Sequence, residues 1–195
     1  MSTGRLVVVK VGGSLLDLPD FSDRLLSYLR RHSLDRLLLL IGGGGATDWV
    51  RLMDRTHHLG EETSHSLALR SLDLTSHLVA AMLPHSVVIE SLAECDSAWT
   101  LSQIPILSPR LFLLADDLRP DPLPHSWDVT SDSIAARVAV RMGADELVLL
   151  KSVNIPSDID LNIMASYRVV DPSFPTAARP VPLVTIRNLR TPPAK

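Results

Sequence analysis

Two continuous apolar runs that each end in glycine constrain the fold of this chain more than any other feature. Residues 6–9 are followed by Lys10 and, one position later, by two glycines, and residues 37–41 are followed directly by four glycines. Runs of this kind are typical of strands buried on both faces, as in a parallel sheet. A predicted helix lies between them. The chain therefore begins with a strand–helix–strand unit, and both glycine loops are expected at the same edge of the sheet.

The first glycine loop has the chemistry of a phosphate site. Lys10 is one of three lysines in the chain, and it would be costly to bury without an anionic partner. Gly12 and Gly13 let backbone N–H groups approach a ligand and form an anion-binding nest, and Ser14 adds a hydroxyl. The alternative is a tight turn with a solvent-exposed lysine. The second loop, residues 42–45, is interpreted in the same way, with a mobile loop as its alternative.

The rest of the chain alternates predicted helices and strands. We expect helices at 21–32, 46–57, 61–83, 92–101 and 131–142, and strands at 86–90, 104–107, 146–150 and 183–186. Residues 109–115 are ambiguous, 116–124 form a loop, and Gly143 occupies the position that favours a helix end. This order predicts a three-layer α/β/α sandwich with a mostly parallel central sheet, formed by residues 1–195 as a single domain.

Composition excludes several classes of partner. The formal net charge is −3, aromatic residues make up 4%, and no basic stripe is visible, so nucleic acid is not expected as a partner. The single cysteine, Cys95, is read as structural and fits a reducing, cytoplasmic setting. No apolar run approaches the roughly 18 to 20 residues that cross a bilayer, so no membrane association is expected.

A second group of polar residues begins the predicted helix 131–142. Thr130 or Ser131 suits the N-cap, and simple capping is the alternative to a functional role. Asp132 could instead fix a lysine by a salt bridge or receive Mg²⁺ indirectly. Lys151 ends the following strand and is a second cation at the same sheet edge, suited to a nucleotide phosphate. The alternative to this role is that Lys151 only buries its aliphatic stem while its ammonium group reaches water.

The segment after the second glycine loop is rich in polar side chains. Arg51, His65 and Arg70 are candidate anion binders for an acidic substrate. His65, Leu69, Asp73 and His77 are spaced by four and share a helix face, but no recognised ligand motif supports a metal site there. Further along, His125 and Trp127 place an imidazole and a flat aromatic ring beside the predicted helix start.

Several of these strings together resemble the amino acid kinase family, which includes carbamate, acetylglutamate, aspartate and uridylate kinases. They are Val9-Lys-Val-Gly-Gly-Ser14, Ile41-Gly-Gly-Gly-Gly45 and Thr130-Ser-Asp-Ser-Ile-Ala-Ala136. The strings Ser64-His-Ser-Leu-Ala68, Leu72-Asp-Leu74 and His125-Ser-Trp-Asp-Val-Thr-Ser-Asp-Ser133 are similar to those of its small members linked to methanofuran biosynthesis. Those members phosphorylate an aminomethyl-furanmethanol phosphate to its diphosphate. The resemblance extends from about residue 5 to 153.

The resemblance implies a cytoplasmic kinase that uses ATP and Mg²⁺ and catalyses by positioning and electrostatics. Residues 1–115 would bind the acceptor, and residues 125–195 would bind a nucleotide. The chain would assemble as a homodimer or a higher homo-oligomer. Lys10 would neutralise the transferring phosphoryl group, Asp132 would orient the lysine, and Ser14 would support the first loop. The other implied phosphate-binding residues are Gly12, Gly13, Gly43 and Gly44. Implied substrate-binding residues are Gly45, Arg51, His65, Arg70, His125 and Trp127, and implied nucleotide-binding residues are Thr130, Ser131, Lys151 and Ser152.

The C-terminal part departs from the family pattern. The last strand continues as Lys151-Ser-Val-Asn-Ile-Pro156 instead of a Thr-Asp-Val-Asp-Gly turn, and no Gly-Gly-Met segment with a second catalytic lysine follows. Lys151 or an arginine such as Arg168 is then expected to replace that lysine. Two alternatives to an active kinase stay open: a kinase-fold binding or regulatory subunit without catalysis, and a nucleotide-binding module of another enzyme.

Overall fold

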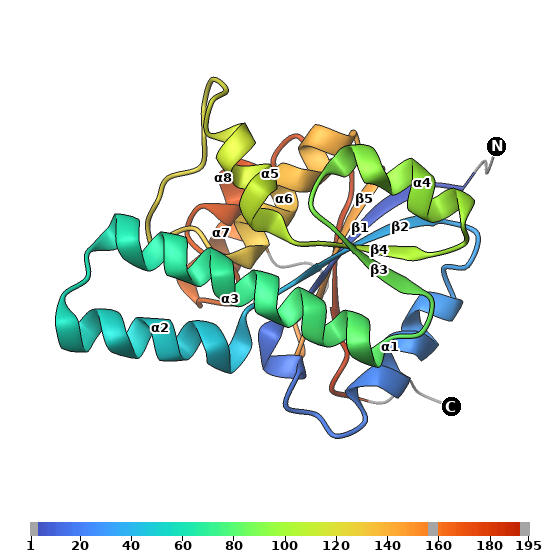
Figure 1. Cartoon of the computed structure of the whole chain (residues 1–195), viewed down its shortest axis with the longest axis horizontal. Coiled ribbons are helices and arrows are strands. Elements are labelled where there is room, and N and C mark those ends of the chain that lie inside the picture. The colour runs from blue at the N-terminus through green and yellow to red at the C-terminus, as the bar shows by residue number, and fades with distance from the viewer. Residues whose placement is uncertain (1–3, 156–159, 192–195) are drawn as a thin grey trace.

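A six-stranded parallel sheet forms the centre of the protein (Figure 1). The computed structural model describes residues 4–155 and 160–191. The strand order is β3-β4-β2-β1-β5-β6, and every pair is parallel. The strands are β1 (Leu6–Val11), β2 (Arg36–Ile41), β3 (Ser86–Ile89), β4 (Ile104–Leu107), β5 (Glu146–Lys151) and β6 (Val184–Asn188). The predicted α/β architecture is confirmed, with a sheet that is parallel throughout.

Helices cover both faces of this sheet. They are η1 (Gly13–Leu15), α1 (Phe21–Arg30), α2 (Gly44–His57), α3 (Glu61–Met82), η2 (Leu92–Glu94), α4 (Cys95–Thr100), α5 (Pro109–Asp116), α6 (Ser131–Met142), α7 (Leu161–Ser166) and α8 (Phe174–Ala178). Figure 1 shows α2 and α3 as an antiparallel hairpin that extends beyond the sheet. No helix within the described residues is long and apolar enough to cross a membrane.

Three local predictions differ from the structure. Helix α2 begins two residues earlier than expected, because Gly44 and Gly45 form its first turn. The ambiguous segment 109–115 is helical, with a proline in the first turn of α5, where its missing N–H costs nothing. The region after β5 contains α7 and α8, which are too short to form without tertiary contacts and therefore carry little periodic signal.

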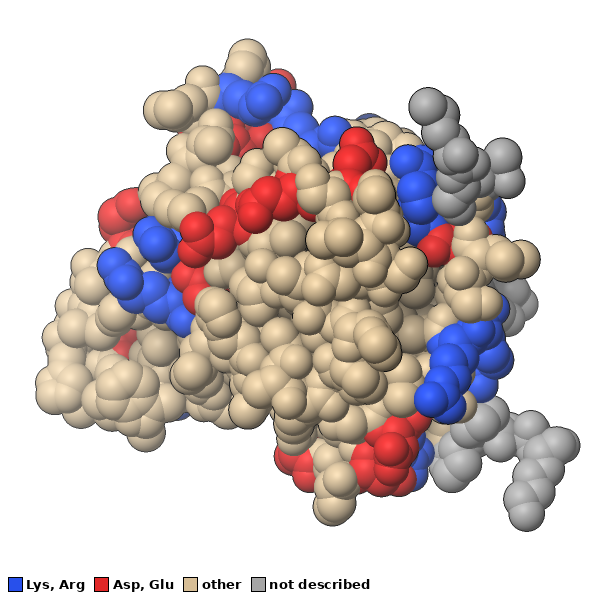
Figure 2. Space-filling view, turned by 45° about the vertical axis from the view of Figure 1, so that its right-hand side comes forward, with Lys and Arg blue, Asp and Glu red and all other residues tan. Residues whose placement is uncertain are grey.

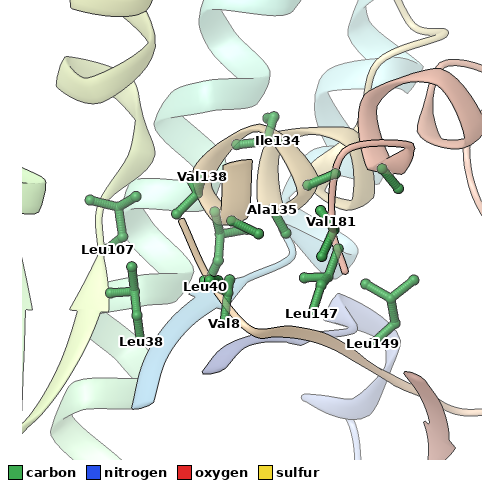
Figure 3. Packing of buried hydrophobic residues seen from close by; sticks show 14 of the residues in the cluster. Val8, Leu38, Leu40, Leu107, Ile134, Ala135, Val138, Leu147, Leu149 and Val181 are labelled. Atoms are coloured by element: carbon green, nitrogen blue, oxygen red, sulfur yellow. The ribbon is translucent and has the colours of Figure 1, made fainter. Parts of the chain in front are cut away.

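The alternation of side chains along the strands divides the core into two clusters. Val8, Leu40 and Leu149 face α6, as Figure 3 shows for the packing beneath that helix. Residues at the intervening positions, such as Val9 and Leu150, belong to the cluster with α1 on the other face. All these side chains are fully buried or nearly so, which explains why the strands read as unbroken apolar runs.

Charged side chains lie mainly around the rim of the face shown in Figure 2 and leave a broad uncharged area in the middle. Basic and acidic groups are interspersed there in small clusters. This distribution agrees with the small formal net charge of −3.

Candidate active site

One buried carboxylate connects two lysines at the carboxyl edge of the sheet. The Asp132 Oδ1 atom lies 2.9 Å from the Lys10 ammonium nitrogen, and Asp132 Oδ2 accepts a hydrogen bond of 2.6 Å from Lys151. The side chains of Lys10 and Asp132 are each only 5% exposed, and that of Lys151 is 12% exposed. The predicted salt bridge to a lysine is therefore present, and it involves both cations at this edge.

Strand pairing explains why these three groups meet. β1 and β5 are neighbours, with Lys10 opposite Leu149 in the parallel register. Lys10 is two residues beyond Val8, and Lys151 is two residues beyond Leu149, so both lysines project from the face that α6 covers. Asp132 lies in the first turn of α6 and reaches down between them.

Burial and the two positive charges set the protonation states. Burial favours a raised pKa for Asp132, but the charges of Lys10 and Lys151 outweigh it and hold the Asp132 pKa below its ordinary value. Burial, and next the charge of Lys10, lower the pKa of Lys151 to about 8, although Asp132 opposes the shift. Lys151 therefore begins to lose its charge at mildly alkaline pH.

This lysine predicts an alkaline limit to any activity that needs its charge. We expect kcat/KM to fall as pH rises through about 8, the pKa of Lys151. Between about pH 8 and pH 10.5, Lys151 binds more protons in the unfolded chain than in the folded chain. The contribution of Lys151 to the free energy of unfolding therefore rises with pH in this range. Activity and stability measured at the same pH values check this: parallel loss of both would contradict it.

The two glycine loops pack directly against each other. A Cβ atom on Gly13 would lie 2.1 Å from the backbone nitrogen of Gly44, and Gly44 has a positive φ of 53°. A Cβ on Gly43 would meet the Thr47 hydroxyl at 1.8 Å. Contact with the first loop therefore accounts for Gly42 and Gly44, and contact with Thr47 accounts for Gly43. Gly45 has no such neighbour. The sequence had suggested a ligand or mobility as the reason for the whole run.

A cavity of about 240 Å³ opens beside these loops. Predicted residues in its lining are Gly13, Ser14, Gly43, Gly44, Arg51, His65, Trp127, Thr130 and Ser131. Its apolar wall comes from Leu69, Leu72 and Ile134. Thr130 and Ser131, predicted for the nucleotide, thus share one cavity with residues predicted for the acceptor. The predicted residues outside that lining include Lys10, Gly12, Asp132, Lys151 and Ser152. The Ser152 hydroxyl is 3.0 Å from the Ser14 hydroxyl.

Arg51 and Trp127 form one wall of the cavity entrance. The guanidinium carbon of Arg51 lies 4.8 Å from the centre of the Trp127 ring, and Arg51 donates a hydrogen bond of 3.1 Å to Asp48. The Trp127 indole N–H donates to Asp54 at 2.9 Å, which fixes the ring. Asp48 also lines the cavity, so the positive charge of Arg51 is balanced at this end.

His65 and His125 stack on each other across the cavity rim. Their ring centres are 4.5 Å apart and their planes differ by 9°. Burial, and next the neighbouring ring, lower the pKa of His65, whereas the hydrogen bond to Glu62 raises the pKa of His125. His125 is also 3.1 Å from Asp117. His65 therefore faces the cavity as a neutral imidazole at neutral pH, and His125 holds it in place.

Three residues predicted for the substrate lie outside the lining, and one of them, His125, adjoins it only through its stacking on His65. Arg70 is exposed on α3 and does not line the cavity, and Gly45 lies on the exposed side of the first turn of α2. The four residues of α3 that are spaced by four, from His65 to His77, also have different surroundings. Asp73 accepts hydrogen bonds from Ser108 and Arg110, and His77 is exposed. Helical spacing identified the face correctly but did not show which neighbours occupy it.

The sequence reasoning missed Asp171, which holds the start of α6. Asp171 Oδ2 accepts hydrogen bonds from the backbone N–H groups of Thr130 and Ser133, and both hydroxyls of these residues also donate to its carboxylate. Burial is the main cause of the raised pKa of Asp171, and the charge of Asp132 adds to it. The only local signal for Asp171 in the sequence was its position directly before Pro172, and an Asp-Pro pair is typical of many turns.

The donor set fits a chain of phosphate groups. Two ammonium groups, backbone amides of two glycine loops and the hydroxyls of Ser14 and Ser131 are all suited to phosphoryl oxygens. The Thr130 hydroxyl is not among them, because it donates to Asp171. The described residues contain no cluster of three or more His, Cys, Asp or Glu side chains arranged for a metal ion. Phosphate groups bound here could themselves carry a Mg²⁺ ion, which commonly binds through substrate phosphates and keeps several waters.

Comparisons with known proteins agree with this geometry. The model of the amino acid kinase family matches residues 5–155. The chain is 27% identical to [5-(aminomethyl)furan-3-yl]methyl phosphate kinase from Methanocaldococcus jannaschii over 179 residues, which cover 86% of this chain and 80% of that protein.

Solved structures with the same fold include two uridylate kinases. The Ureaplasma parvum UMP kinase superposes with a TM-score of 0.72 at 15% identity and covers 97% of this chain and 92% of its own. The uridylate kinase of Archaeoglobus fulgidus gives a TM-score of 0.61 at 17% identity, with 88% of this chain and 84% of its own covered. At these identities the superpositions define the fold alone.

Proposed function

The chain belongs to the amino acid kinase family and is a phosphotransferase, and we propose that it transfers the γ-phosphoryl group of ATP to the phosphate of [5-(aminomethyl)furan-3-yl]methyl phosphate, in methanofuran-type one-carbon cofactor synthesis. The observation that carries this proposal is the buried Lys10–Asp132–Lys151 group beside two glycine loops. The family relative with 27% identity, named for this acceptor, supports the choice of substrate.

The reaction needs few groups that exchange protons. An oxygen of the acceptor phosphate attacks the γ-phosphorus, a new P–O bond forms, and the bond to the β–γ bridging oxygen breaks so that ADP leaves. Lys10 neutralises charge on the transferring group, and the amides of Gly13, Gly43 and Gly44 bind its oxygens. The predicted role of the Gly12 amide is wrong, because that N–H donates a hydrogen bond of 2.8 Å to the Leu150 carbonyl. Asp132 keeps both ammonium groups in position. Bound ATP supplies the phosphoryl group, with Mg²⁺ neutralising its phosphate oxygens.

The cavity lining supports a small aromatic acceptor. At about 240 Å³ it is smaller than most sites for drug-sized ligands, which span about 300–1,000 Å³. We assign Trp127 to the furan ring, Arg51 and neutral His65 to polar contacts, and His125 to positioning His65. Asp48 provides a carboxylate for an acceptor ammonium group. Arg70 and Gly45 are not part of this assignment, because both lie outside the lining.

Lys151 and Ser152 are proposed for the nucleotide, together with Thr130 and Ser131. Lys151 then replaces the second lysine of other family members, since its ammonium group already shares Asp132 with Lys10. Arg168, the other candidate, has no ion pair or side-chain hydrogen bond within residues 4–155 and 160–191. In this proposal residues 1–115 supply most of the acceptor side and residues 125–195 the nucleotide side of a single domain.

Phosphorus NMR of ATP–Mg²⁺ mixed with the furan phosphate tests the proposal. We expect ADP and a diphosphate ester to form in equal amounts, with UMP as a poor acceptor. Calorimetry with ATP–Mg²⁺ examines the alternative of an inactive subunit. Absence of nucleotide binding at millimolar concentration would favour that alternative, and binding without transfer to this acceptor would refute the substrate assignment.

A homodimer through α3 is also proposed. Its exposed apolar residues Leu67, Leu74 and Leu78 lie on one helix face, at spacings of seven and four. Leu111 and Leu114 of the neighbouring α5 are also exposed. Sedimentation equilibrium should give twice the monomer mass, and Leu74→Glu should give the monomer mass. An unchanged mass in that variant would exclude this face.

A further inference from the structure

We propose a second ligand site at the opposite edge of the sheet, for a small organic oxyanion that carries a phosphate or carboxylate on an apolar body. The site is a cavity of about 420 Å³ between α1, the start of β2 and the turn before β4. This volume is within the range of about 300–1,000 Å³ that is typical of small-molecule sites. None of its lining residues lines the active-site cavity.

Two unpaired arginines line this cavity. Within residues 4–155 and 160–191, neither Arg30 nor Arg36 forms an ion pair, and neither guanidinium donates a hydrogen bond to a protein group. The carboxylate nearest in sequence, Asp35, is already occupied, with Arg5 and His32 each 3.2 Å away. Arg36 is half-buried and its Nε atom is fully buried without an acceptor. An oxyanion in the cavity would bind the terminal guanidinium nitrogens of Arg30 and Arg36, for which no protein acceptor is present within the described residues.

Trp99 holds Arg36 in a fixed position. The Arg36 guanidinium carbon lies 5.3 Å from the centre of the Trp99 ring, and the indole N–H donates a hydrogen bond of 2.9 Å to the Leu37 carbonyl. The tryptophan ring is therefore anchored to the backbone of β2. A guanidinium held in this way loses little conformational freedom when it binds an anion.

The remaining lining matches a ligand with one charged end. Leu26, Leu29 and Ile104 provide apolar surface for its body. The side chains of Ser33, Ser102 and Gln103 provide further donors for an anionic head group.

The two sites are separated by the length of β2. Arg36 is the first residue of that strand, and the second glycine loop follows its last residue, Ile41. Six strand residues span about 20 Å. A ligand at Arg36 therefore does not compete with a phosphate at Lys10, and binding at the two sites can be measured separately.

The indole N–H signals of the three tryptophans provide a direct test. We would assign the Trp99 signal with Trp99→Phe and titrate the full chain with phenyl phosphate, benzoate and neutral phenol. Phenyl phosphate or benzoate should shift the Trp99 signal in a saturable way, and phenol should not. The stronger of the two anions identifies the preferred head group. The shift should persist in Lys10→Met, because that variant affects only the active site.

Matched arginine variants then locate the site. Arg36→Met and Arg30→Met should each weaken binding at least tenfold. Arg5→Gln should not, because Arg5 lies at the same edge but is already paired with Asp35 and Glu146. Arg30 is exposed and remote from the Trp99 stack, so its variant stays informative if Arg36→Met fails to fold. No saturable shift, or equal shifts in both methionine variants and the parent, would overturn the proposal.

Discussion

Replacement of Lys10 with methionine should lower kcat for phosphoryl transfer about a thousandfold or more while the protein stays folded. Methionine keeps most of the apolar stem but removes the cation closest to Asp132 Oδ1. The developing charge on the phosphoryl group then loses its buried counter-charge. Asp132 remains paired with Lys151 at 2.6 Å, so the variant is not left with an isolated buried carboxylate.

Single-turnover kinetics and thermal unfolding together measure this effect. Arg119→Met is a suitable control, because Arg119 is an exposed cation whose side chain is 62% accessible and lies outside the cavity lining. It should keep the activity of the parent. Turnover of Lys10→Met at the parent rate, with matching unfolding curves, would remove Lys10 from the mechanism.

Asp132→Asn should produce the largest loss of stability. The substitution leaves the ammonium groups of Lys10 and Lys151 close together without the carboxylate that neutralises them. Removal of one partner from a buried ion pair typically costs about 3–5 kcal/mol. Without the carboxylate, which opposes the lowering of the Lys151 pKa, Lys151 should also release its proton more readily, and this limits the loss at alkaline pH. The free energy of unfolding should therefore fall most near and below neutral pH.

Urea titrations at pH 6 and pH 9 examine this expectation. Asp128→Asn is the matched control, since Asp128 lies four residues earlier, is exposed and forms no side-chain hydrogen bond or ion pair within the described residues. We expect its free energy of unfolding to change by less than about 0.5 kcal/mol. An equally small effect for Asp132→Asn would contradict the central role of this carboxylate.

The sheet and the lysine pair were predictable because both depend on short-range patterns. Unbroken apolar runs predicted buried parallel strands, and β1, β2 and β5 follow them closely. A lysine at a strand end beside glycines indicated an anion site. The start of α6 with Asp132 was predictable from its cap residues and from the family resemblance. Residues 131–142 are helical as predicted, and Gly143 ends that helix with a φ of 61°.

Other features depend on partners far away in the sequence and left no local signal. Asp171 contacts Ser133, which is 38 positions earlier in the sequence, and Trp127 is fixed by Asp54, which is 73 positions earlier. Arg70 and Arg51 look equally suitable as anion binders in sequence, but only Arg51 lines the cavity. The direction in which a helix faces its neighbours decides this, and helical spacing alone does not define that direction.

The contact between Gly13 and Gly44 limits how this protein can change over evolutionary time. A single methyl group added to Gly13 would overlap the backbone of the other loop, so neither segment can accept a side chain unless its counterpart retreats. Because the obstructing atoms are backbone atoms of glycines, a second substitution cannot make room, and both positions should stay glycine unless a loop changes its path. The hairpin of α2 and α3, which adjoins one of these loops, can diverge far more freely along its exposed length.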